Sequence, residues 1–247
     1  MRRRLAILFL AAMIELFGSA LPVRAQIKVK WFGQSCFQIT SPAGVKILLD
    51  PFTPSLQLHY PLPEVFPNLV LISHEHFDHN NAAMAKGNPK IIHGLNPATG
   101  KFEPFNETIQ DVKVYSVESS HDDFGGRERG KNAIMVMEMP GMKIVHLGDL
   151  GTLLSEGQVQ KIGKVDVLLI PVGGVYTITA EQAGQVGDQL KPKLIIPMHY
   201  KTDAITIKLD PVDKFLAGKK NVEKVKGNEY VIKSLPAQPK IIVMDYK

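Results

Sequence analysis

The sequence predicts an α+β fold in which layers of β-sheet are faced by helices. Short apolar, β-branched runs dominate the first half of the chain, and in the second half such runs alternate with helical segments. Once residues 1–25 are set aside, residues 26–247 have the size of one domain that buries a core without disulfides. The only cysteine, Cys36, cannot form an internal bridge, and we expect a small core residue there rather than a nucleophile.

The strands are predicted from runs rich in Val, Ile, Leu and Phe. They are expected at 27–32, 36–40, 45–49, 69–72, 90–92, 112–117, 133–138, 143–146, 167–170, 194–196, 230–233 and 241–244. Thr179-Ala180-Glu181-Gln182 forms a capping box that opens a helix through about Leu190, with Pro192 beyond its end. Shorter helices are predicted at 155–162 and after Pro211.

The first 25 residues have the pattern of a secretory signal peptide. Three arginines at 2–4 precede a mostly apolar run at 5–16, and Val23-Arg24-Ala25 offers small residues at the −3 and −1 positions of a cleavage site. The apolar run is short and interrupted for a membrane span, although an uncleaved anchor is the alternative. We therefore expect cleavage before Gln26 and an exported protein, periplasmic or secreted, with no stable membrane span and one domain at 26–247.

The charge of the exported part is close to balanced. The whole chain has 29 Lys and Arg and 24 Asp and Glu; residues 1–25 hold four of the former and one of the latter, which leaves 25 and 23. A net charge of about +2 gives no general attraction for nucleic acid or anionic membrane. We expect a small-molecule substrate and no nucleic-acid partner, and no motif indicates an oligomeric state.

The stretch His74-Glu75-His76-Phe77-Asp78-His79 places four potential metal ligands within six residues. It follows the apolar run 69–72, so a buried strand would hold the ligands on a stiff platform. His74 and His76 are two residues apart and point the same way from extended backbone, so they can bind one ion. Asp78 and His79 follow and can reach a second ion.

Three further ligand-type residues each come at or after the end of a predicted strand: His121, Asp149 and His199. Imidazole and carboxylate groups without thiolates suit Zn²⁺, with Mn²⁺ or Fe as substitutes. Seven such ligands are enough for two ions. A hydroxide held between two cations is a nucleophile near neutral pH, and Asp78 is the expected group to orient or deprotonate the attacking water.

These residues and their neighbours resemble the metallo-β-lactamase superfamily over nearly all of residues 26–247. The motifs that carry the resemblance are 31–37, 49–52, 73–79, 121–122, 148–149 and 197–200. Residues 146–151 and 171–177 are similar to the branch that includes ascorbate-6-phosphate lactonase-like proteins. The resemblance implies a four-layer αββα sandwich with the metals at one edge of the sheets. It also implies a division of the ligands: His74, His76 and His121 on one ion, Asp78, His79 and His199 on the other, and Asp149 bridging.

Several residues near the predicted ligands have supporting or uncertain roles. Related branches often carry His at the position of Gln34 and Thr at that of Leu150, which puts any ligand or acid role of Gln34 in doubt. Asp50 is expected to accept an N–H from a ligand histidine rather than only to form a turn. His146 is expected to be buried and hydrogen-bonded near Asp149. The two other histidines are predicted not to bind metal: His59 and His93.

Two side chains are candidates for substrate contact. The loop 125–130 is a solvated turn in one interpretation; in the other, Arg129 or Arg127 contacts an anionic group of the substrate. Tyr176 also has two interpretations: it packs in the core, or it directs its hydroxyl at the negative charge that develops over the metals during the reaction.

The function predicted is a metal-dependent hydrolase that cleaves an ester, lactone, amide or phosphodiester bond. The alternative is a non-catalytic metal-binding or ligand-sensing module with the same fold. A nuclease of the superfamily is disfavoured by the charge and by the absence of a basic-aromatic cluster, and an antibiotic-specific β-lactamase by the branch motifs.

Overall fold

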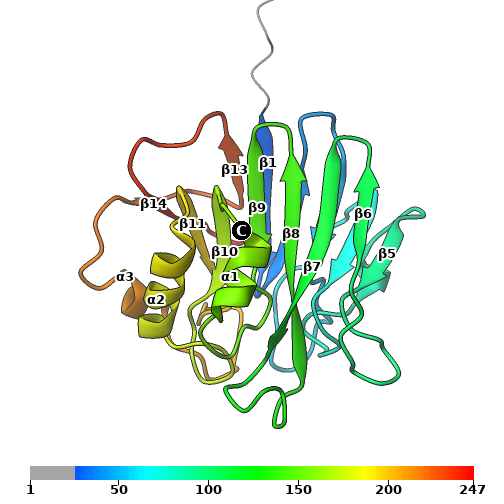
Figure 1. Ribbon diagram of the computed structural model, residues 1–247, viewed down its shortest axis with the longest axis horizontal. Coiled ribbons are helices and arrows are strands. Elements are labelled where there is room, and N and C mark those ends of the chain that lie inside the picture. The colour runs from blue at the N-terminus through cyan, green and yellow to red at the C-terminus, as the bar shows by residue number, and fades with distance from the viewer. Residues whose placement is uncertain (1–25) are drawn as a thin grey trace, which may run out of the picture.

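The computed structural model describes residues 26–247, so the predicted signal segment lies outside the described residues. Two β-sheets pack against each other, and helices cover the outer side of one of them (Figure 1). The predicted α+β sandwich with the metallo-β-lactamase fold is confirmed, with few helices relative to its strands.

The first sheet has six strands in the order β13-β1-β2-β3-β4-β5. Their bounds are β1 (Ile27–Gly33), β2 (Cys36–Thr40), β3 (Lys46–Leu49), β4 (Leu69–Ile72), β5 (Lys90–His93) and β13 (Glu229–Ile232). Strands β1 to β3 form antiparallel hairpins, whereas β3, β4 and β5 run parallel. The chain after β4 therefore leaves the sheet at the same edge as the chain after β3.

The second sheet has eight strands in the order β12-β14-β11-β10-β9-β8-β7-β6. Their bounds are β6 (Asn106–Ile109), β7 (Val112–Ser120), β8 (Lys131–Met139), β9 (Met142–His146), β10 (Val167–Pro171), β11 (Leu194–Met198), β12 (Val222–Lys224) and β14 (Lys240–Val243). Strands β9, β10 and β11 are parallel, and β7 and β9 are each antiparallel to β8. The C-terminal ends of β7, β9, β10 and β11 therefore meet at one edge of the sheet.

Three α-helices lie on the outer side of the second sheet, away from the first (Figure 1). They are α1 (Glu156–Ile162), α2 (Ala180–Leu190) and α3 (Val212–Leu216). Capping boxes begin α1 at Ser155 and α2 at Thr179, because each hydroxyl accepts the backbone N–H three residues on and the side chain there bonds back. Helix α2 buries Ala183, Val186 and Leu190 against the sheet.

The first sheet is buried on both faces. Alternate residues of β3 and β4 enter two different cores: Ile47 and Leu71 pack between the sheets, while Leu48 and Val70 face outward. The outward set is covered by Phe52 and other side chains of 52–65 and by the short 3₁₀ turn η1 (Ala82–Met84). The outer layer on this side is therefore mostly irregular chain.

Two strands that the sequence pattern does not predict are the end strands of the eight-stranded sheet, β6 and β12. Their residues are partly or fully exposed. Backbone pairing to a single neighbour holds an edge strand, so it needs no apolar run and gives a weak sequence signal. The predicted strands and helices are confirmed, with ends that differ by at most three residues.

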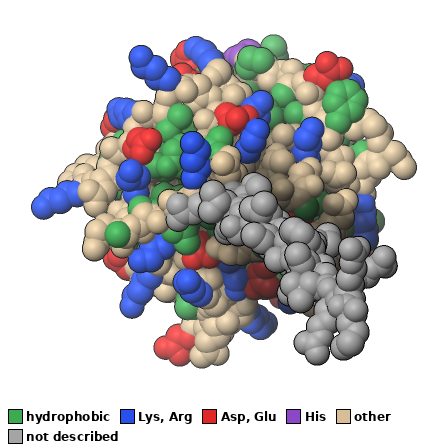
Figure 2. All heavy atoms as spheres, turned by 90° about the horizontal axis from the view of Figure 1, so that it is seen from above, with side chains coloured by type: hydrophobic (Ala, Val, Ile, Leu, Met, Phe, Trp, Pro, Cys, Tyr) green, Lys and Arg blue, Asp and Glu red, His purple; other side chains and the backbone are tan. Residues whose placement is uncertain are grey.

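The surface is electrostatically mixed. On the face seen from the end where residue 26 enters β1, basic and acidic side chains are interspersed (Figure 2). Among residues 26–247, no helix is long and apolar enough to cross a membrane.

Candidate metal centre

Four strand ends deliver the seven predicted ligands to one place. His74, His76, Asp78 and His79 follow β4, and His121 directly follows β7. Asp149 follows β9, and His199 follows β11. Because the inter-sheet core fixes these strands, the segments that carry the ligands start from rigid positions.

The seven side chains form two adjoining groups, each able to hold a metal ion. His74, His76 and His121 make the first group; Asp78, His79, Asp149 and His199 make the second, and the ligand atoms within each group lie within 4.8 Å of one another. His59 and His93 belong to neither group within the described residues. The first group contains only imidazoles, whereas the second also contains two carboxylates.

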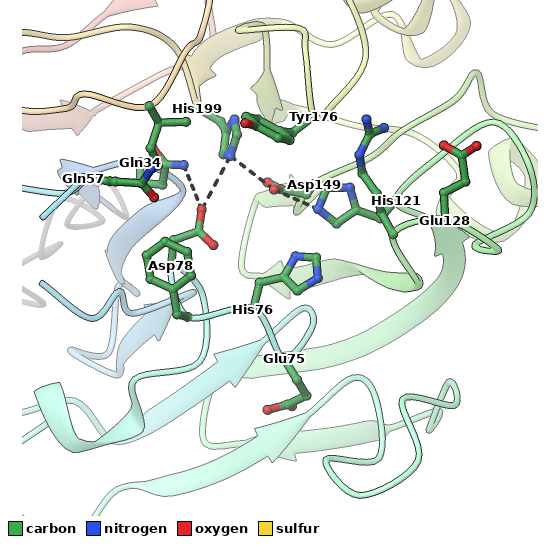
Figure 3. A pocket seen from close by; sticks show the side chains of 13 residues that line it. Gln34, Gln57, Glu75, His76, Asp78, His121, Glu128, Asp149, Tyr176 and His199 are labelled. Carbon is green, nitrogen blue, oxygen red and sulfur yellow. Dashed lines mark hydrogen bonds and ion pairs between the residues drawn. The ribbon is translucent and has the colours of Figure 1, made fainter. Parts of the chain in front are cut away.

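Asp149 lies between the two groups. Its Oδ2 is 3.2 Å from the Nε2 atoms of His79, His121 and His199. Figure 3 shows this carboxylate between His121 and His199, above Asp78 and His76. The backbone N–H of Asp149 donates to Asn132 Oδ1 at 3.0 Å, which fixes the turn that carries it.

A buried carboxylate under the site sets the ring orientation of two histidines. Asp50 accepts hydrogen bonds from Ser73 N at 2.7 Å, from Ser73 Oγ at 2.6 Å and from His79 Nδ1 at 2.9 Å. Because Ser73 Oγ gives its proton to Asp50, it accepts from His74 Nδ1, which lies 2.9 Å away. Nδ1 of both rings is therefore occupied beneath the site, and Nε2 is the atom that faces the ligand groups.

The ring nitrogens that face the two ligand groups fit a cation. His79 Nε2 is buried and has no hydrogen-bond partner among the described residues, yet it lies close to two carboxylates. His74 Nε2 and His76 Nδ1 are 3.0 Å apart, an arrangement typical of two nitrogens that share a metal. A buried polar atom without a partner costs free energy, and coordination removes that cost.

The pKa shifts of the histidines indicate which rings carry a proton that a bound cation would replace. Burial lowers the pKa of His74 well below its ordinary value, and the neighbouring imidazoles lower it further. Burial also opposes charging of His79, but Asp149 and Asp78 outweigh it and raise the pKa of that ring well above its ordinary value. Against the same burial, Asp149 and Asp78 raise the pKa of His199 to about 9. Without metal, protons on His79 and His199 thus balance the carboxylates.

A pocket of about 520 Å³ opens onto both groups. Its wall includes His76, Asp78, His121, Asp149 and His199, and it extends to both candidate substrate contacts, Arg129 and Tyr176. His146 is also placed near the centre but is fully buried beneath it; its Nε2 lies 2.9 Å from the backbone oxygen of Ser35, and its Nδ1 accepts the N–H of Gly148.

The structure adds two residues to those predicted from the sequence. Gln34 donates its side-chain amide to Asp78 Oδ2 at 2.9 Å and accepts the backbone N–H of His199 at 3.1 Å. Asn132 binds Ser119 Oγ, the Leu147 carbonyl and Asp149 N. Both residues have uncharged amide side chains, and nothing in the surrounding sequence marks such a residue as part of a metal site.

Comparison with known proteins identifies a family for the chain. Residues 28–199 match the model of the β-lactamase superfamily domain family. A "UPF0173 metal-dependent hydrolase" of Nanoarchaeum equitans is 31% identical over 231 residues, which cover 82% of this chain and 97% of that protein. Another of the same name, from Polynucleobacter asymbioticus, is 30% identical and covers 82% of this chain and 85% of its own length.

A solved structure agrees. A candidate zinc-dependent hydrolase of the metallo-β-lactamase superfamily from Thermotoga maritima superposes with a TM-score of 0.71 at 38% identity, covering 88% of this chain and 98% of the other. The family match, the related sequences and the shared fold agree with the metal-binding geometry of the strand ends. The chain therefore belongs to the UPF0173 metal-dependent hydrolases of the metallo-β-lactamase superfamily.

Proposed function

We propose that the protein is a two-metal hydrolase that cleaves a bond in a small molecule. The observation that carries the proposal is the position of Asp149, whose Oδ2 lies 3.2 Å from one imidazole of the first ligand group and from two of the second. A carboxylate oxygen so placed can join two cations. His74, His76 and His121 would hold one ion, and Asp78, His79 and His199 the other.

Zinc is the proposed ion, because its usual ligands are imidazole and carboxylate, with Mn or Fe as substitutes. When bound, the two ions would lower the pKa of a water molecule and polarise the oxygen of the scissile group. The protein's own part is to orient these ligands and to shape the pocket above them.

Asp78 is the proposed catalytic carboxylate. Among the described residues, its contacts with Gln34, His79 and His199 all use Oδ2. Its second oxygen is therefore left to position a water molecule at the pocket. Burial alone would raise the pKa of Asp78, but His79 and His199 together outweigh this and hold it well below the ordinary value, which favours orientation of water over deprotonation.

The proposed scissile bond is an ester, lactone, amide or phosphodiester. We also propose export, on the basis of the signal-like segment 1–25. Mass determination of the protein purified from its native compartment tests this, with Gln26 as the expected first residue.

The experiment for the central proposal combines metal analysis with turnover. We expect about two equivalents of Zn per chain and metal-dependent cleavage of generic esters or lactones that a chelator abolishes and Zn²⁺ or Mn²⁺ restores. Asp78→Ala should reduce kcat by about 10²-fold or more. A metal-loaded protein that turns over no ester, lactone, amide or phosphodiester would instead be a non-catalytic metal-binding module.

A further inference from the structure

The pocket wall includes a short loop whose backbone is fixed by one buried side chain. Asp122 is 2% exposed and accepts backbone N–H groups from Phe124 at 2.9 Å, Gly126 at 2.8 Å, Glu128 at 3.0 Å and Arg129 at 2.8 Å. Four bonds to one carboxylate hold residues 122–129 in one arrangement. Arg129 therefore projects from an ordered base, although its side chain is exposed.

A second loop meets the Arg129 side chain. The guanidinium carbon of Arg129 lies 5.8 Å from the ring centre of Tyr176, within the range of a cation–π contact. Tyr176 follows β10, and the backbone of its loop is tied to the Asp149 segment by the hydrogen bond from Ile178 N to the Leu150 carbonyl at 2.9 Å. Two loops from different strands thus bring a cation and an aromatic ring to the same pocket as the metal ligands.

The cation has no anionic partner within residues 26–247. None of the ion pairs among these residues involves Arg129. Of the pocket carboxylates outside the ligand groups, Glu75 is bound to His93 Nδ1 at 2.7 Å, and Glu128 lies on the outer side of His121, away from Asp78 (Figure 3). The charged N–H groups of Arg129 are therefore free to bind a ligand.

Apolar side chains line the same pocket as this cation. Phe77 is 44% exposed and Tyr176 41% exposed, and both line the pocket together with Ile207. Exposed aromatic surface on a concave wall is typical of a site that binds an apolar ligand part. The wall therefore combines one cation with apolar surface, next to the ligands of the proposed metals.

We propose that the substrate carries a carboxylate or phosphate group that Arg129 binds, beside an apolar part that packs on Tyr176 and Phe77. The inference rests on the proposed hydrolase function, and it narrows the substrates to small anionic, partly apolar molecules. The planar guanidinium suits either oxyanion, since both present two oxygens to its paired N–H groups.

The test uses binding, so that it does not depend on turnover. Phenylphosphonate, phenylacetate and the neutral benzyl alcohol are titrated calorimetrically into the zinc-loaded, full-length protein. We expect at least one anion to bind tenfold or more tightly than benzyl alcohol. Phenylphosphonate and phenylacetate then distinguish a phosphate site from a carboxylate site.

Arg129→Gln should weaken binding of the favoured anion about tenfold or more, because charge-assisted hydrogen bonds are lost. The matched control is Arg127→Gln: it removes the same charge two residues away, and Arg127 bonds the Phe124 carbonyl and does not line the pocket. Tyr176→Phe should keep most of the affinity, and Tyr176→Ala should lose several-fold.

Three results would overturn the inference: no anion preference in the unaltered protein, unchanged affinity in Arg129→Gln, or an equal loss in Arg127→Gln. The last would mean that general charge, not a built contact, attracts the anion. Failure of the hydrolase proposal is a separate outcome, because it appears as absent metal-dependent turnover while the anion titrations still give their own answer.

Discussion

Gln34 donates its side-chain N–H to Asp78 Oδ2 at 2.9 Å, and this bond joins the β1–β2 turn to the loop after β4. Gln34 is fully buried and has a positive φ of 50°, a conformation that costs a non-glycine residue about 1–3 kcal/mol. Its backbone oxygen also accepts from His199 N at 3.1 Å. One strained residue thus holds two members of the second ligand group.

For the proposed two-metal site, Gln34→Met should therefore weaken the binding step at the second ligand group by about 10- to 100-fold, because an unsupported carboxylate is a poorer ligand. The other step, at His74, His76 and His121, should be unchanged. Calorimetric titration of metal-free protein with Zn²⁺ measures both steps. Gln57→Met is the control, since Gln57 lines the same pocket but is exposed. Equal weakening of both steps would contradict the assignment.

Asp50→Asn should lower the free energy of unfolding of the metal-free protein by about 3 kcal/mol, because a fully buried carboxylate that accepts three hydrogen bonds loses its charge. Urea denaturation measures the change. Asp111→Asn makes the same substitution at a partly buried carboxylate that accepts from Ser41 and Ala43, and it should cost about 1 kcal/mol. A smaller effect at Asp50 than at Asp111 would show that Asp50 does not support the site.

Gly151→Ala should displace the backbone at His121. An added Cβ at Gly151 would lie 2.2 Å from the His121 carbonyl carbon and 2.3 Å from Asp122 N, and such overpacking costs about 1–3 kcal/mol. We expect a lower melting temperature and weaker binding at the first ligand group. Gly157→Ala in α1 meets no atom within 4 Å and should stabilise the protein by up to about 1 kcal/mol. Unchanged metal binding in Gly151→Ala would contradict the close contact.

Removal of metal should make stability depend on pH in the alkaline range. Burial opposes protonation of His199, but Asp149 and Asp78 raise its pKa from 6.5 to about 9. A raised pKa in the folded protein gives stability that is fully present below pH 6.5 and lost as the pH rises through about 9. Melting curves of chelated protein between these limits should fall with pH. Zinc-loaded protein should not show this loss, because the cation takes the place of the proton; parallel curves would refute the coupling.

The sequence alone determined the fold class, most strands and helices, and the set of candidate ligands. Local signals are carried by the apolar runs 69–72 and 167–170 and by the capping box at Thr179, because burial and helix capping act on neighbouring residues. The spacing of His74 to His79 likewise shows its chemistry without a structure. Edge strands β6 and β12 were missed, since backbone pairing holds them and their partly or fully exposed residues form no apolar run.

Only the tertiary structure decided how close the ligands lie to one another and which residues support them. It placed Asp149 Oδ2 at 3.2 Å from three imidazoles of separate segments, and it brought Gln34 to Asp78 across 44 residues. It also set Arg129 over Tyr176. The physical reason is that these contacts join residues far apart in the sequence. They depend on how the two sheets pack and where the strand ends meet, which no local pattern of side chains encodes.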